Sequence, residues 1–133
     1  MCLDLWFAGM ETTSNTLSWG VVYILNHMDV QAKLHEEMDR EIGSSRAITM
    51  ADKNRLPYTN AVVNVEELIP FSIGKRQCLG EGLAKMELFL FIANLFNRFE
   101  LSCENPSEPP SMKKTFGTTV QPSEYHCFAK SRF

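Results

Sequence analysis

The residues around Cys78 form a pattern suited to holding a metal ion. Within residues 71–80, five residue types stand at fixed spacing: Phe71-x-x-Gly74-x-Arg76-x-Cys78-x-Gly80. The apolar stretch that follows predicts a helix, so Cys78 lies just before a helix N-terminus, where the helix dipole and free N–H groups stabilise a thiolate. An isolated cysteine is more often a buried structural residue. The position of Cys78 before a predicted helix favours a stabilised thiolate.

A second group of chemically useful residues, Glu11 and Thr12, lies near the start of the chain. It belongs to the run Ala8-Gly9-Met10-Glu11-Thr12-Thr13, inside an apolar stretch without proline, residues 1–28, that predicts a helix. A glycine within a helix costs about 1 kcal/mol relative to alanine, which indicates the close approach of a ligand or a local distortion. A hydroxyl next to a carboxylate is suited to proton delivery. Alone, this pattern is a weak signal.

Together, and in this order, the two motifs resemble those of the cytochrome P450 family. The first matches the family's haem-ligating signature, F-x-x-G-x-R-x-C-x-G, and the second resembles its oxygen-activation motif, A/G-G-x-D/E-T-T/S. With each residue type at a background frequency of roughly 5%, five fixed positions match by chance in a chain of this size about once in ten thousand times or less. The resemblance covers nearly the whole chain, as two pieces of a P450.

The resemblance implies a role for each motif residue. Cys78 would be the axial thiolate ligand of a haem iron, and Arg76 would pair with a haem propionate. Thr12 and Glu11 would deliver protons to the oxygen site. The remaining motif residues would shield the sulfur, let the backbone lie close to the macrocycle or border the distal pocket (Phe71, Gly74, Gly80, Ala8 and Gly9).

The reaction implied by the resemblance is a monooxygenation, in which one oxygen atom from O2 enters a small apolar organic substrate and a P450 reductase supplies electrons. The implied fold is mainly α, a C-terminal part of the P450 fold with long buried helices and a few short C-terminal strands. Full-length microsomal members lie on the cytoplasmic face of the endoplasmic reticulum membrane through an N-terminal anchor. That anchor is missing here, so the chain itself is expected to be cytoplasmic or unstable.

The hydrophobic pattern predicts four helices and two strand regions around these motifs. Asp29 is expected to cap the second helix and Gly43 to end it. Thr49-x-x-Asp52 predicts a short capped turn, and the charged residues 36–41 are interpreted as a solvated helix face. The predicted helices cover residues 1–28, 29–42, 57–64 and 79–99, and the predicted strands lie at 99–103 and within 116–129.

The chain is expected to be one partial P450 domain, residues 1–133, made of two pieces. Residues 1–64 would carry the oxygen-binding helix and the helices after it, and residues 65–133 the cysteine loop, the long helix and the C-terminal strands. The family's E-x-x-R helix, with the strands and meander that follow it, is expected to be deleted at a junction near residues 64 and 65. Glu37-x-x-Arg40 has the same spelling. It lies in the wrong helix, and we interpret it as a coincidence.

These deletions are expected to leave apolar helices without the segments that enclose them. We therefore expect exposed apolar patches, poor folding and weak haem binding. The alternative interpretation is a non-catalytic helical fragment, or a remnant that binds haem or a partner. It would be inactive because the E-x-x-R helix and the N-terminal part are missing.

The composition of the chain disfavours three classes of protein: those that bind nucleic acid, those with zinc sites and those that span a membrane. The chain has 133 residues, about one domain, with 13 Lys and Arg against 16 Asp and Glu, a formal net charge of −3. This balance disfavours nucleic acid as a partner, because binding to phosphates requires clustered basic residues. The four cysteines lack zinc-site spacing, which indicates free thiols in a reducing compartment. No apolar run reaches the roughly 18 residues that predict a membrane span.

Overall fold

The computed structural model describes residues 2–63, 71–117 and 119–133, so the predicted junction near residues 64 and 65 lies outside the described residues. The fold is mainly helical, as predicted. The helical elements are α1 (Cys2–Asn26), α2 (Met28–Glu41), η1 (Met50–Arg55), α3 (Pro57–Val63), η2 (Gly74–Arg76) and α4 (Glu81–Arg98). The strands are β1 (Phe99–Cys103), β2 (Lys114–Phe116), β3 (Val120–Pro122) and β4 (Cys127–Ser131).

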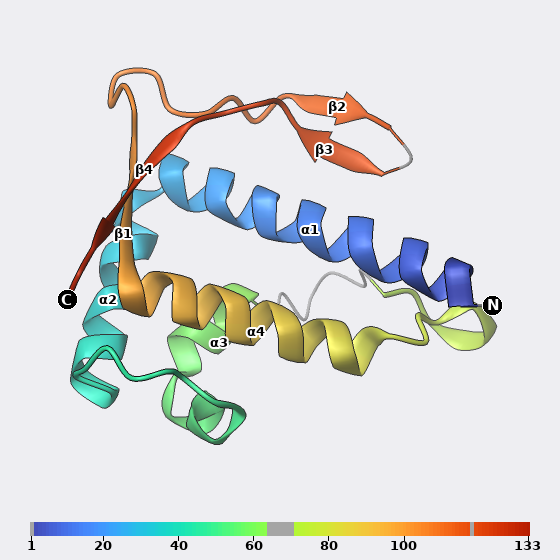
Figure 1. The fold of residues 1–133 in the computed structure, drawn as a ribbon, viewed down its shortest axis with the longest axis horizontal. Helices are drawn as coiled ribbons and strands as arrows, with labels where there is room; N and C mark the ends of the chain where they lie inside the picture. Colours follow the sequence, from blue (N-terminus) through green and yellow to red (C-terminus); the bar gives the residue numbers. More distant parts are fainter. Residues whose placement is uncertain (1, 64–70, 118) are drawn as a thin grey trace.

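The two long helices, α1 and α4, both begin at the same end of the molecule and run toward the other end (Figure 1). They approach closely at Gly20, where an added Cβ atom would lie 3.5 Å from Cδ1 of Ile92. A Cβ atom at this position would thus make an ordinary van der Waals contact with Ile92, which shows that α1 and α4 are packed against each other here.

The hydrophobic core lies toward the C-terminal ends of α1 and α4, where α2 and β1 meet them. Its buried members are Ile24, Leu25, Leu34, Met38, Ile48, Leu56, Phe89, Ile92, Ala93, Phe96 and Leu101. Burial of this apolar surface is the main term that stabilises the fold. It also explains why the two long helices stay together at this end of the molecule.

The N-terminal half of α1 extends beyond this core. Leu3, Trp6 and Phe7 are 72%, 66% and 65% exposed, and Leu83 in the first turns of α4 is 58% exposed. The expectation of exposed apolar patches is confirmed. The N-terminal half of α1 lies outside the hydrophobic core, whose buried members from α1 are Ile24 and Leu25.

The C-terminal residues form two small antiparallel sheets, β1–β4 and the hairpin β2–β3. The prediction of strand β1 at 99–103 is confirmed. The predicted strand within 116–129 is instead two separate strands, since Pro122 ends β3 and β4 begins at Cys127. Proline has no N–H group to donate to a ladder, which explains the break.

The second helix begins earlier than the sequence predicts. His27 is its N-cap and Asp29 lies in the first turn, so the predicted Asp29 cap is wrong. Gly43 has φ of 61° directly after the helix, the left-handed conformation that favours glycine, and the predicted helix end is confirmed. The predicted turn is also confirmed, because Thr49 and Asp52 form a reciprocal capping box at the start of η1.

Glu37 is buried, with 4% of its surface exposed, although the charged residues around it were predicted to form a solvated face. Its carboxylate accepts hydrogen bonds from the backbone N–H groups of Tyr58 at 2.7 Å and Thr59 at 2.8 Å, and from the Thr59 hydroxyl at 2.7 Å. These N–H groups belong to the first turn of α3, where the helix itself supplies no acceptor. The Glu37 carboxylate thus joins α2 to the N-terminus of α3.

Replacement of Glu37 by alanine is expected to lower the free energy of unfolding by about 2–3 kcal/mol, because the buried donors of Tyr58 and Thr59 would lose their acceptor. Urea unfolding followed by circular dichroism measures this change. The matched control is Glu36→Ala, which removes an exposed carboxylate from the same helix and should change stability by less than about 0.5 kcal/mol. Equal effects of the two substitutions would contradict the role of Glu37.

Asp52 is the second carboxylate that holds this region together. Two hydrogen bonds from Arg46, at 2.9 and 2.7 Å, hold its pKa well below the ordinary value of 3.8, and the backbone N–H of Thr49 adds to this effect. A carboxylate with a lowered folded-state pKa stabilises the fold fully above its unfolded pKa, and this contribution is lost as pH falls toward the folded pKa.

We therefore expect the free energy of unfolding to decrease from about pH 4 downward, and the decrease to be smaller in Asp52→Asn. Thermal unfolding between about pH 2 and pH 7 measures the slope. Asp29→Asn serves as the control, since the Asp29 side chain is 70% exposed and forms a 3.9 Å ion pair with Lys33. An unchanged acid slope in Asp52→Asn would show that Asp52 does not set it.

Candidate functional site

The segment around Cys78 is an exposed loop that a few backbone contacts hold in shape. The Cys78 N–H donates to the Phe71 carbonyl at 2.8 Å, which closes the loop, and η2 forms one short turn within it. Ser72 and Gly74 both have positive φ, 61° and 71°. Such a conformation is uncommon for a residue other than glycine and concentrates at functional sites.

The loop leads directly into α4, whose N-cap is Gly80. Cys78 stands two residues before this cap, near the end of α4 where the helix dipole is positive. The Glu81 carboxylate, in the first turn of α4, forms a 2.8 Å ion pair with Lys85. It also accepts a 2.9 Å hydrogen bond from the side-chain amide of Gln77. These contacts, with that of Lys85 the larger, lower the pKa of the Glu81 carboxyl.

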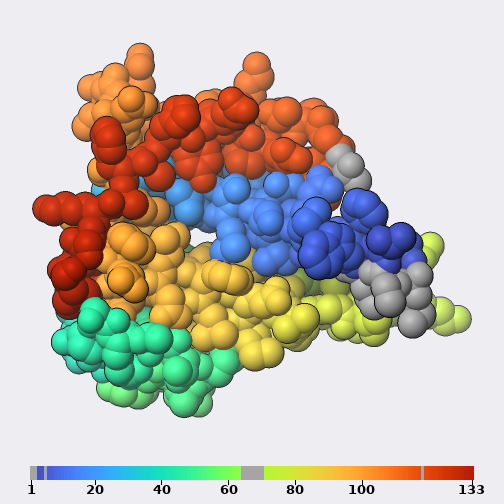
Figure 2. Space-filling view, viewed as in Figure 1, coloured from blue at the N-terminus to red at the C-terminus, as the bar shows by residue number. Residues whose placement is uncertain are grey.

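Residues of both sequence motifs line one cavity of about 580 Å³ between α1 and the cysteine loop. The lining residues are Ala8, Thr12, Thr13, Thr16, Val63, Phe71, Ser72, Arg76, Cys78, Ala84 and Leu88. Figure 2 shows the N-terminal part of α1, in dark blue, at the same end of the molecule as the yellow-green segment that carries Cys78. Two motifs nearly sixty residues apart in the sequence therefore contribute to the lining of the same space.

The side of α1 that faces this cavity is a stripe with helical spacing, Ala8, Thr12 and Thr16. The Thr12 hydroxyl donates to the Ala8 carbonyl at 2.6 Å, and the Thr16 hydroxyl donates to the Thr12 carbonyl at 2.8 Å. Bonds of this kind engage the hydroxyl protons within the helix. The oxygen of Thr12 is thereby left to accept a hydrogen bond from a group in the cavity.

A neighbouring stripe of α1, Glu11, Asn15 and Trp19, contacts the β2–β3 hairpin instead. The Glu11 carboxylate accepts a hydrogen bond from the Thr119 hydroxyl at 2.9 Å, and Asn15 also donates to that hydroxyl. The Trp19 indole N–H donates to the Val120 carbonyl at 3.1 Å. Adjacent helical residues point about 100° apart, so Glu11 faces the hairpin and Thr12 faces the cavity.

The structure thus brings together five of the predicted site residues, Ala8, Thr12, Phe71, Arg76 and Cys78, at one cavity. It does not bring the other four, Gly9, Glu11, Gly74 and Gly80, into the lining. A Cβ atom added at Gly9, Gly74 or Gly80 would meet no atom of the described residues within 4 Å. Sequence reasoning missed Thr16 and Ser72, although the four-residue spacing from Thr12 would have indicated Thr16.

A second, mostly apolar cavity of about 700 Å³ adjoins the first and shares Thr16, Val63 and Leu88 with it. Its other lining residues come from α1, α2, α3 and α4 (Trp19, Gly20, Tyr23, Ile24, Val30, Tyr58, Ala61, Val62 and Ile92). It lies next to residue 63, after which the described residues are interrupted until residue 71.

Comparison with protein-family models finds one family that matches both pieces of this chain. The cytochrome P450 model matches residues 1–68 and again residues 64–128, which together include both motifs. This chain belongs to the cytochrome P450 family. The predicted family is therefore confirmed, and so is the predicted fold class, a mainly helical part of the P450 fold.

Mammalian P450s are among the curated relatives of this chain. Cytochrome P450 2D26 of Rattus norvegicus is 31% identical over 198 residues, covering 98% of this chain and 40% of that protein. Cytochrome P450 2U1 of Homo sapiens is 29% identical over 191 residues, covering 92% of this chain and 35% of that protein. This P450 chain thus spans about two fifths of the length of the curated relatives it matches.

Solved P450 structures have the same arrangement of elements. A zebrafish cytochrome P450 solved with abiraterone matches with a TM-score of 0.88 and 25% identity, over 98% of this chain and 46% of that chain. A second zebrafish structure, solved with progesterone, matches with a TM-score of 0.87 and 24% identity over 95% of this chain and 44% of that chain.

The alignments also reveal a difference in length inside the matched region. The match with the rat protein extends over 198 aligned positions but covers 98% of the 133 residues of this P450 chain, about 130 residues, so the rat protein carries about 68 residues without a counterpart here. The family model likewise matches in two pieces that meet at residues 64–68.

Two other findings concern the described residues alone. Among them no helix is long and apolar enough to span a membrane. Within the same ranges, no group of three or more His, Cys, Asp and Glu side chains is placed to hold a metal ion. A site built from several protein ligands therefore does not occur there, whereas a single axial cysteine ligand needs no such group.

Glu11→Ala is expected to loosen the β2–β3 hairpin, because Thr119 would lose its carboxylate acceptor. With a loss of about 1 kcal/mol, backbone amides of residues 114–122 would exchange with deuterium about fivefold faster. Hydrogen-exchange mass spectrometry measures these rates, with Asp29→Ala as the exposed control. Unchanged exchange in the hairpin of Glu11→Ala would contradict a structural role for this carboxylate.

Proposed function

We propose that this chain carries the haem-binding centre of a P450 monooxygenase, with Cys78 as the thiolate ligand. One observation supports this proposal above all others. The cavity between α1 and the cysteine loop is lined by Cys78 on one side and by Thr12 on the other. These are the residues that the family resemblance assigns to the two faces of a haem.

The residues around the cavity suit a flat apolar group with an iron centre and carboxylates. Its volume of about 580 Å³ lies within the usual range for cofactor pockets, about 300–1,000 Å³. Ala8, Ala84 and Leu88 supply apolar walls, Cys78 supplies the soft sulfur donor, and Arg76 supplies a cation for a carboxylate. The donor set therefore fits haem.

In the proposed site, the chain's residues bind, orient and shield the group. Cys78 donates its sulfur while the N-terminus of α4 stabilises the negative charge. Arg76 holds a propionate by a charge-assisted hydrogen bond. Phe71 and Ser72 line the cavity beside Cys78, and Gly74 and Gly80 keep the loop free of bulk. When bound, a thiolate-ligated haem supplies the oxygen activation that a monooxygenase needs.

The opposite wall of the proposed site is α1, where the small side chain of Ala8 would leave space for a small ligand. The Thr12 hydroxyl lies at the cavity, where it would take part in proton delivery once a bound ligand replaced its hydrogen bond to the Ala8 carbonyl. Glu11 is held by Thr119 on the neighbouring face of α1. Its contribution to proton delivery requires release from that hydrogen bond.

The activity, substrate and partners of the whole enzyme extend beyond this chain, which spans 40% of the rat relative. For the whole enzyme we propose the family reaction, insertion of one oxygen atom from O2 into a small apolar organic substrate. Electrons would come from a P450 reductase. The corresponding location is the cytoplasmic face of the endoplasmic reticulum membrane.

We also propose that the two pieces of this chain, residues 1–64 and 65–133, join near residues 64 and 65. The split family match and the longer rat sequence support this junction. The missing residues would include the E-x-x-R helix, which supports the cysteine loop in the family. Its loss agrees with the exposure of residues 72–80, and it would weaken haem affinity because the ligand loop lacks supporting contacts.

Haem titration of the purified chain tests the proposed site. With ferric haem in excess, followed by reduction and carbon monoxide, we expect an absorption band at about 450 nm, the signature of thiolate ligation. The band should disappear in Cys78→Ser and remain in the matched control Cys103→Ser. Because the loop is exposed, we expect no bound haem after purification without added haem.

The outcome also separates this proposal from the alternative of a non-catalytic helical fragment. If saturating haem produces no such band, or if the band persists in Cys78→Ser, the proposed ligand is wrong. Circular dichroism of each variant distinguishes a lost ligand from a lost fold, since Cys78→Ser changes an exposed side chain and should retain the helical signal.

A further inference from the structure

Two half-buried cysteines outside the cavity face each other across a strand pair. Cys103, at the end of β1, stands opposite Cys127, at the start of β4, in the antiparallel register. In the same ladder the Arg132 N–H donates to the Arg98 carbonyl at 2.9 Å, so residues 98 and 132 form a hydrogen-bonded pair. Such pairs alternate along the ladder with pairs that are not hydrogen-bonded. Five positions further on, Cys103 and Cys127 are therefore a non-hydrogen-bonded pair.

Leu101, two positions before Cys103, supports this assignment. Its backbone N–H donates to the Gln31 side chain, and its carbonyl accepts from the same side chain, both at 2.8 Å. Both backbone groups of Leu101 are thus directed to α2 rather than to β4. Leu101 therefore belongs to a non-hydrogen-bonded pair. Because the two kinds of pair alternate along an antiparallel ladder, Cys103, two positions further on, also belongs to a non-hydrogen-bonded pair.

The spacing of such a pair suits a covalent bond. Opposite Cα atoms in a non-hydrogen-bonded pair lie about 4.5 Å apart, within the range of about 4.4–6.8 Å that a disulfide spans. Both cysteines are free and both pack against the hydrophobic core. Burial raises the pKa of the Cys127 thiol, and the nearby Cys103 adds to the rise.

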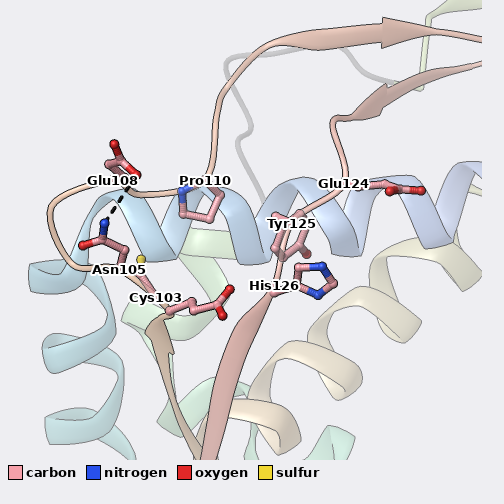
Figure 3. A pocket seen from close by; sticks show the side chains of 8 residues that line it. Cys103, Asn105, Glu108, Pro110, Glu124, Tyr125 and His126 are labelled. Atoms are coloured by element: carbon pink, nitrogen blue, oxygen red, sulfur yellow. Dashed lines mark hydrogen bonds between the residues drawn. The ribbon is translucent and has the colours of Figure 1, made fainter.

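A small reagent has a route to this pair. Cys103 lines a pocket of about 260 Å³ with Asn105, Pro110, Tyr125 and His126, and with three glutamates, Glu104, Glu108 and Glu124. Figure 3 shows Cys103 at the end of β1, Asn105, Glu108 and Pro110 on the loop that follows it, and Glu124, Tyr125 and His126 on the segment that leads into β4. The carboxylates disfavour an anionic reagent and admit an uncharged one.

We propose that Cys103 and Cys127 are a disulfide-forming pair that a small, uncharged disulfide oxidises. The Cys103 thiolate attacks one sulfur of the reagent and releases one thiol, which gives a mixed disulfide. The Cys127 thiolate then attacks the Cys103 sulfur and releases the second thiol. In total, the two cysteines lose two protons and two electrons, and the reagent gains them.

The bond would close a loop from residue 103 to residue 127 that contains the β2–β3 hairpin. That hairpin rests on Glu11, Asn15 and Trp19 of α1, next to the stripe that lines the cavity. Oxidation therefore restricts the segment that covers one side of α1. The pairing itself does not depend on haem or on the role of Cys78.

The test uses the full chain with Cys2→Ser and Cys78→Ser, which leaves only the proposed pair. The chain is treated with 2-hydroxyethyl disulfide at mildly alkaline pH, the remaining thiols are alkylated, and tryptic peptides are identified by mass spectrometry. We expect peptides 99–113 and 115–130 to be joined, with a mass about 2 Da below their sum, and to separate after reduction.

A register control tests whether the fold creates the pair. Adding Ser102→Cys and Cys103→Ser moves one thiol by one position, to the opposite face of β1. We expect the joined peptide to form at least tenfold more slowly in this control, and the difference to vanish in urea. The proposal would be overturned if, without urea, the control formed the joined peptide as fast as the chain that retains Cys103. It would also be overturned if the folded chain that retains Cys103 formed only mixed disulfides with the reagent.

Discussion

The close packing of α1 on α4 is the constraint on which the rest of this structure depends. The two helices meet at Gly20 and Ile92, and the core around Phe89 and Phe96 holds their C-terminal halves together. Since both helices begin at the same end of the molecule, their N-terminal ends stand on two sides of one cavity (Figure 1). The loop before α4 thereby carries Cys78 to a position facing the stripe of α1 that contains Thr12.

The same helix serves two separate purposes on two adjacent stripes. Ala8, Thr12 and Thr16 face the cavity, and the stripe formed by Glu11, Asn15 and Trp19 anchors the β2–β3 hairpin. A hydroxyl and a carboxylate that are neighbours in sequence are therefore engaged on different surfaces. The hairpin, α1 and the cavity wall form a connected unit, so a change at the base of the hairpin acts on the helix that borders the site.

Much of this arrangement could be predicted from the sequence. The spacing of residues 71–80 identified the family, and apolar periodicity located all four helices, because both signals are local. The buried Glu37 could not be predicted from its charged neighbours, since its burial depends on α3 packing against α2. The orientation of Glu11 likewise depends on a hairpin more than one hundred residues away, and the strand pairing of Cys103 with Cys127 depends on a register that no local pattern specifies.

The central claim is that the cysteine loop and the start of α1 face one cavity, and a distance-dependent measurement tests it most directly. A nitroxide attached to Cys78, with the other three cysteines changed to serine, broadens nuclear magnetic resonance signals of nearby groups. We expect strong broadening of the Ala8 and Thr12 methyl signals and little at Val22, which lies about 15 Å further along α1. Equal broadening at all three positions, or none at Ala8 and Thr12, would contradict the shared cavity.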